Sequence, residues 1–116
     1  MKEKVDMNLA MLIVYNTLGV GKENAVSRRQ IAESTGYSDR LVRECIERLR
    51  EEDPILSATD GSGYYIATED NNGKEEAFKW ATGQNRRADS IRASCRGAQK
   101  LIARVQQMEM GECKNG

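Results

Sequence analysis

The chain has 116 residues, so we expect one domain with an appendage. Its 18 basic and 18 acidic side chains cancel, and it has no histidine. Three widely spaced cysteines without a CxxC pair predict free thiols in a reducing cytoplasm and no bound metal or cofactor. No run approaches the ~18 apolar residues of a membrane span, and the first residues lack a signal pattern, so we expect a cytoplasmic protein.

The balanced total charge conceals a difference between the two parts of the sequence. Residues 1–70 hold nine basic and thirteen acidic side chains, a net charge of −4. Residues 71–116 hold nine basic and five acidic side chains, a net charge of +4. A polyanion is therefore attracted more strongly to the C-terminal part than to the N-terminal part.

A first helix is predicted from a cap at Asp6 to about residue 18, because two glycines follow it closely. Apolar side chains lie on two sides of this helix, which therefore needs two burial surfaces or full burial. One surface is the core of its own domain, and the other is the C-terminal helix or a second subunit. The first stripe is Leu9, Leu12, Ile13 and Asn16, and the second is Met7, Met11, Val14 and Leu18.

Two short helices are predicted after a very short strand at 25–26. A capping box that starts at Ser27 opens the first of them, which stops at Gly36. Ser38 then caps a second helix, which runs from 39 to about 52 and ends because a proline follows. Its inward positions, at helical spacing, are Leu41, Val42, Cys45, Ile46 and Leu49.

The next stretch changes from helical to strand-like composition. Residues 55–59 and 64–68 are rich in β-branched and aromatic side chains and predict two short strands. The glycine-containing segment 60–63 between them predicts a β-hairpin. Polar turn residues then mark the end of a domain that we place at residues 1–72.

One long helix is predicted over residues 73–110, followed by a flexible tail at 111–116. Small and apolar residues recur in it at alternating steps of four and three, which is a heptad pattern. An isolated helix buries nothing, so we expect this seam to pair with a second chain or with the second stripe of the first helix. The predicted dimerisation residues are Ala88, Ile91, Cys95, Ala98, Ile102 and Val105.

A basic stripe runs beside this seam. Arg92, Arg96, Lys100 and Arg104 recur every four residues, so they lie along one side of the predicted helix. One interpretation is a contact with nucleic acid or with an acidic partner. The other is the solvated flank of a coiled coil.

Residues 28–46 carry the pattern that indicates a function. Their sequence, RRQIAESTGYSDRLVRECI, places a small residue at position 32, a glycine at 36, an aliphatic residue at 42 and hydrophobic residues one turn later. With the hairpin that follows, residues 7–70 resemble the winged helix-turn-helix family, in particular small bacterial and bacteriophage regulators. The resemblance implies a mainly α fold with a small β-hairpin as the wing, followed by the long C-terminal helix.

In that family the second helix of the motif, here 38–52, enters the major groove of double-stranded DNA. The resemblance implies that Arg40 and Arg43 read guanines, and that Asp39 or Glu44 accepts from cytosine or orients an arginine. Backbone N–H groups at the preceding helix start favour a phosphate. The DNA-binding residues implied are Ser27, Arg28, Arg29, Ser38, Asp39, Arg40, Arg43, Glu44, Glu47 and Ser62.

The expected function is a sequence-specific DNA-binding transcriptional regulator that acts as a homodimer. Two features favour a different class, a winged-helix protein-interaction or assembly module that docks through its C-terminal helix. Residues 55–69 contain no Lys or Arg, and the helix at 38–52 carries acidic residues that repel phosphate. Such a module would act in phage replication or packaging, or as an inhibitor. No enzyme is expected, because the sequence has no histidine and no catalytic or phosphate-binding motif.

Overall fold

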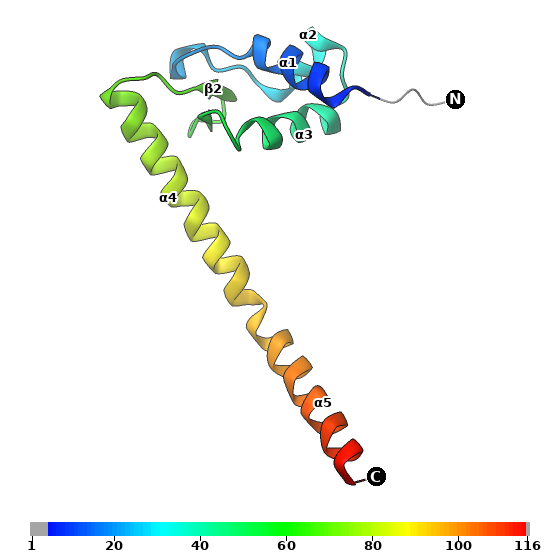
Figure 1. Ribbon diagram of the computed structural model, residues 1–116. Helices are drawn as coiled ribbons and strands as arrows, with labels where there is room; N and C mark the ends of the chain where they lie inside the picture. The colour runs from blue at the N-terminus through cyan, green and yellow to red at the C-terminus, as the bar shows by residue number, and fades with distance from the viewer. Residues whose placement is uncertain (1–4, 116) are drawn as a thin grey trace. The chain divides into compact units, whose positions relative to one another are not determined.

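A computed structural model describes residues 5–115, with side chains as far as residue 111. The fold is mainly helical with one small sheet (Figure 1). The chain divides into two compact units, the first ending at Trp80 and the second beginning at Ala81. The elements in chain order are α1 (Met7–Thr17), η1 (Lys22–Asn24), α2 (Arg28–Thr35), α3 (Asp39–Leu49), β1 (Ile55–Ser57), β2 (Tyr64–Ile66), α4 (Asn71–Ser94) and α5 (Arg96–Asn115).

Side-chain caps open each of the first three α-helices where the sequence predicts them. Asp6 accepts from the backbone N–H of Leu9 at 3.2 Å at the start of α1. Ser27 caps α2 in a reciprocal capping box, which satisfies two backbone N–H groups at once. Gly36 ends α2 in the left-handed conformation, with φ +76°, and the chain enters α3 after only two further residues.

The core of the first unit lies where α1, α2 and α3 contact one another. The predicted inward face of α3 is confirmed: four of its five positions are buried, and Leu41 is half-buried against them. The helix itself is shorter than the predicted 38–52. After Leu49, the N–H groups of Glu51 and Glu52 bond to carbonyls three residues back instead of four, so the chain continues as turns. The buried core residues are Ala10, Val14, Leu18, Ile31, Val42, Cys45, Ile46, Leu49 and Ile55.

Among the described residues, helix α1 buries only one of its two apolar stripes in the core of the first unit. The second stripe, which includes Val14 and Leu18, packs into the core of the first unit. It is therefore not free to receive the C-terminal helix, as one of our expectations required. The first stripe is the open one, with Leu9 51% and Leu12 57% exposed.

The sheet consists of β1 and β2, paired antiparallel with Leu56 opposite Tyr65. Both strands are shorter than predicted, and the strand expected at 25–26 is a single bridge in which Val26 and Tyr64 exchange backbone hydrogen bonds of 2.8 and 3.0 Å. The two faces of the hairpin are covered differently: Ile55 packs into the helical core, while Leu56 and Tyr65 join a second cluster.

That second cluster fixes the start of α4 to the hairpin. Ala77 and Trp80 pack against buried Leu56 and Tyr65. The carboxylate of Asp70 accepts from the backbone N–H of Gly73 at 2.8 Å. The first turns of α4 therefore belong to the first unit, which extends beyond the boundary predicted at residue 72.

The second unit is helical, but it is not the single uninterrupted helix predicted over 73–110. The helix breaks at Cys95, whose N–H bonds to the carbonyl of Arg92, three residues back, at 3.1 Å. The hydroxyl of Ser94 donates to the Ile91 carbonyl at 2.6 Å, and this is the acceptor that an unbroken helix would offer to Cys95. Beyond the break, α5 continues to Asn115 where the sequence predicts a tail from residue 111.

Candidate nucleic-acid interface

Helix α3 presents a charged outer face. Arg40, Arg43, Glu44 and Glu47 are all exposed and line one shallow groove on this face. Ser38 begins the helix, and its hydroxyl accepts from the Leu41 N–H at 3.2 Å. The sequence-predicted base-reading residues are therefore brought together on one surface by the burial of the opposite side of the helix.

The charges in this groove are not equivalent. Glu44 accepts from Arg48 at 3.2 Å, one helical turn further on, so its charge is partly compensated. Among the side chains that the structure describes, Arg40 and Arg43 make no ion pair. Their guanidinium groups are therefore available for the forked hydrogen bonds that arginine makes with guanine or phosphate.

The predicted phosphate-binding residues at the start of α2 lie close to α3. Arg28 Nε donates to the carboxylate of Asp39, and this hydrogen bond, with a smaller contribution from Tyr64, raises the pKa of Arg28. Asp39 therefore holds an arginine rather than standing free to accept from a base. Arg29 is 87% exposed and pairs with Glu33 at 3.2 Å. The hydroxyl of Ser27 accepts from the N–H of Gln30 at 3.0 Å in the capping box.

The hairpin loop is exposed and carries a negative charge. Its predicted contact residue, Ser62, is exposed, and the Ser62 N–H donates to the Asp60 carboxylate at 2.9 Å. Hydrogen bonding from Ser62 lowers the pKa of Asp60, so this carboxylate stays ionised. The loop thus offers hydroxyl and amide donors to a phosphate but adds a repulsive charge beside them.

Arg50 is a structural residue whose role no sequence pattern indicates. Its guanidinium carbon lies 4.6 Å from the Trp80 ring centre and 5.3 Å from that of Tyr64. It donates to the Ile55 carbonyl at 2.9 Å and to the Ser57 hydroxyl at 2.7 Å. Burial lowers its pKa. Arg50 therefore joins the end of α3, the hairpin and the start of α4, and it is unavailable to DNA.

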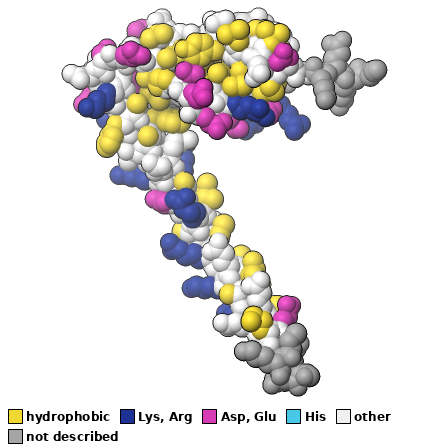
Figure 2. Space-filling model, in the orientation of Figure 1, with side chains coloured by type: hydrophobic (Ala, Val, Ile, Leu, Met, Phe, Trp, Pro, Cys, Tyr) yellow, Lys and Arg dark blue, Asp and Glu magenta, His cyan; other side chains and the backbone are white. Residues whose placement is uncertain are grey.

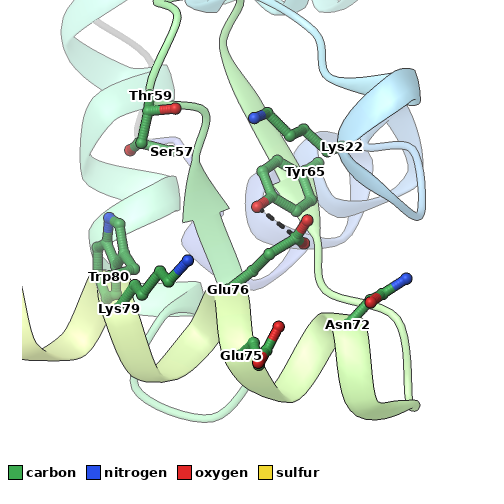
Figure 3. A pocket seen from close by; sticks show the side chains of 9 residues that line it. All are labelled: Lys22, Ser57, Thr59, Tyr65, Asn72, Glu75, Glu76, Lys79 and Trp80. Atoms are coloured by element: carbon green, nitrogen blue, oxygen red, sulfur yellow. Dashed lines mark hydrogen bonds between the residues drawn. The ribbon is translucent and has the colours of Figure 1, made fainter.

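A second concavity, of about 390 Å³, lies between η1, the hairpin and the first turns of α4 (Figure 3). Within it, the Tyr65 hydroxyl donates to the Glu76 carboxylate at 3.1 Å. The remaining charged residues of its lining are Lys22, Lys79 and Glu75. Because these charges balance and the central pair satisfies itself, the lining favours no particular charged ligand.

The predicted dimerisation residues of the second unit lie mostly at the surface. Ile91 is 65% exposed, Ile102 55% and Val105 42%. Ala98 and Cys95 are exposed as well, and Ala88 is half-buried. Basic side chains gather along this part of the chain on a different side from the hydrophobic ones (Figure 2). The break at Cys95 divides the predicted seam between α4 and α5.

Comparison with models of protein families, with curated proteins and with solved structures finds no match to this chain. Among the described residues, no helix is both long and apolar enough to cross a membrane. The side chains that the structure describes also contain no group of three or more potential metal ligands.

Proposed function

We propose that this chain is a sequence-specific DNA-binding transcriptional regulator that acts as a homodimer, with α3 as its recognition helix. The observation that carries the proposal is the outer face of α3, where Arg40 and Arg43 are exposed near the helix start and unpaired among the described side chains. The N-terminal half of a recognition helix is the part that meets base edges in the major groove.

The surroundings of α3 support the same proposal. Helix α2, the left-handed turn at Gly36 and α3 follow one another in the order of a helix-turn-helix motif, and the β1–β2 hairpin comes next, as a wing does. Helix α2 begins with Arg28 and Arg29 beside the start of α3. Phosphates that flank a base contact would meet these two cations and the α2 N-terminus.

Exposed apolar side chains support the dimer. Five large ones, which isolated chains would leave in water, lie between residues 91 and 108 of the second unit. A second chain that covers them would also supply a second recognition helix and double the number of phosphate contacts. These side chains are Ile91, Leu101, Ile102, Val105 and Met108.

The decisive experiment uses the full chain to select duplexes from a random DNA library. The affinity of the chain is then measured for the selected duplex and for an unrelated duplex. We expect Arg40→Ala and Arg43→Ala each to weaken the selected duplex by about 1–3 kcal/mol and to relax the sequence preference. Lys79→Ala is the control, because it removes the same charge from an exposed position outside α3. It should weaken both duplexes equally.

A protein-interaction or assembly module is the second candidate, and two observations favour it. The exposed hairpin loop holds Asp60 and no basic residue. In addition, Leu9 and Leu12 on α1 are open to a partner protein. Failure of the chain to bind any duplex at low salt, or unchanged affinity and preference in both arginine variants, would favour this class over a DNA-binding regulator.

A further inference from the structure

Helix α5 carries three exposed cations, Arg96, Lys100 and Arg104, which we call the basic ridge. They are spaced four residues apart, so each stands about 6 Å further along the helix axis than the last. All three belong to one uninterrupted helix, since α5 begins at Arg96, immediately after the break. The ridge is therefore a regular row of positive charge.

These charges are uncompensated within the described part of the chain. None of the three cations takes part in an ion pair there, and Glu109 is the only carboxylate among residues 96–111. Three cations of the first unit differ, because Arg28, Arg29 and Arg48 each have a carboxylate partner among the described side chains, whereas Arg40 and Arg43 do not. An unneutralised row of this kind attracts a partner with regularly spaced negative charges.

Much of the ridge lies away from the centre of the apolar side of α5, although Met108, four residues after Arg104, continues the line of the ridge. Lys100 is two residues from both Ala98 and Ile102, which places it about 160° around the helix from each of them. The separation of basic and hydrophobic side chains can be followed along this stretch in Figure 2. All three ridge residues lie at least about 120° from Ala98 and Ile102, so a dimer formed through these two residues leaves the ridge accessible.

We propose that the basic ridge binds the phosphate backbone of nucleic acid without regard to sequence. Phosphates follow one another at 3.4 Å of axial rise per strand, so a step of about 6 Å on the helix corresponds to roughly two phosphates. A membrane surface suits α5 less well, because helices that lie in the interface carry Trp, Phe or Leu on the apolar side, and residues 96–111 contain no aromatic residue and one Leu. The inference rests on the proposed function, since it assigns to α5 the nonspecific part of the same DNA binding.

The test measures binding of the full chain to an unrelated duplex over a series of salt concentrations. Neutralising the ridge in an R96Q/K100Q/R104Q variant should make the slope of log K against log salt shallower by about 2–3 for each bound chain. The matched control removes the same charge from exposed lysines of the first unit in a K22Q/K74Q/K79Q variant. Its slope should change by less than about one. Equal slopes in the two variants would overturn the inference.

Further measurements separate the possible causes of a changed salt dependence. Sedimentation should show the same association state for the ridge variant and the unaltered chain, and the single substitution Lys100→Gln should give about a third of the slope change. Ridge-dependent binding to phosphatidylserine vesicles with no change in the duplex slope would assign the ridge to membranes and overturn the nucleic-acid inference. Loss of slope in the ridge variant, with no effect of Arg40→Ala or Arg43→Ala on sequence preference, would refute the proposed function alone.

Discussion

The Nε of Arg28 donates to the carboxylate of Asp39, so the first residue of α2 is joined to the first residue of α3. The pair spans the turn at Gly36 and lies at the surface, with side chains 40% and 56% exposed. It therefore orients a cation beside the proposed recognition helix. At the same time, the negative charge of Asp39 partly neutralises Arg28 and so weakens its attraction for a phosphate.

The first prediction concerns this pair. Asp39→Asn should cost less than about 1 kcal/mol of stability, because exposed ion pairs contribute little. It should also bind an unrelated duplex more tightly, since it releases Arg28 and removes a negative charge. Urea unfolding and fluorescence anisotropy measure the two effects. A folded Asp39→Asn protein that binds the duplex more weakly would show that Asp39 itself takes part in DNA recognition.

A second prediction compares two glycines that both have positive φ. Gly36, at φ +76°, has no atom within 4 Å of an added Cβ, so Gly36→Ala should cost about 1–2 kcal/mol from backbone strain alone. Gly63, at φ +128°, would place its Cβ 2.0 Å from the Val26 carbonyl oxygen. Gly63→Ala must therefore also break the bridge between Val26 and Tyr64. Urea midpoints should fall clearly further for Gly63→Ala; equal losses would contradict the close approach at this position.

The third prediction concerns alkaline pH. Burial, together with the hydrogen bond to Glu76, raises the pKa of Tyr65 to about 12, against about 10 for an unfolded tyrosine. The neutral phenol therefore stabilises the fold fully below pH 10, and this contribution, on the order of 2 kcal/mol, is lost as pH rises from about 10 to 12. Urea unfolding at several pH values should show a steeper alkaline loss for the unaltered chain than for Tyr65→Phe. Tyrosinate absorbance provides an independent titration, and identical pH profiles would refute the shift.

The fourth prediction addresses Arg50. Arg50→Lys keeps the charge but loses the planar group that lies over Trp80 and Tyr64 and donates to Ile55 and Ser57. We expect a loss of about 1–2 kcal/mol of stability, with Trp80 fluorescence reporting the change of its surroundings.

Arg48→Lys is the control for this substitution, because Arg48 is exposed and pairs only with Glu44 among the described side chains. It should change stability by less than about 0.5 kcal/mol. Similar losses in the two variants would mean that the stacked arrangement of Arg50 contributes nothing specific.

The fifth prediction tests the dimer. Ile102→Asp should shift the chain toward monomer in sedimentation, because it places a charge in the exposed apolar surface of α5. Gln107→Asp adds the same charge about 140° away on the same helix and should leave association unchanged. If the unaltered chain is already monomeric, or if both variants dissociate alike, the apolar side of α5 is not the interface.

Local features of the first unit could be read from the sequence. The caps at Asp6, Ser27 and Ser38 and the buried face of α3 depend on residues within a few positions of one another. Their chemistry therefore does not require knowledge of the rest of the fold. The exposure of Arg40 and Arg43 follows from the same helical periodicity.

Features that depend on distant contacts could not be read in this way. The stacking of Arg50 joins Tyr64 and Trp80, which lie in two later elements, and no spacing rule connects them. The end of the first unit at Trp80 depends on the packing of α4 onto the hairpin, and not on the polar turn residues before α4. The heptad pattern also did not predict the helix break, because it records only the spacing of apolar residues. The break accompanies a hydrogen bond from the Ser94 hydroxyl to a backbone carbonyl, which this spacing does not include.

The three-residue backbone step at Cys95 has a consequence for how a dimer would respond to protein concentration. It puts the apolar repeats on its two sides out of phase, so a straight partner helix cannot follow Ile91 and Ile102 in one continuous register. In the proposed dimer, the paired stretch would then be short and the association reversible. By mass action, occupancy of a two-fold DNA site by the proposed dimer would then rise with up to the square of the chain concentration.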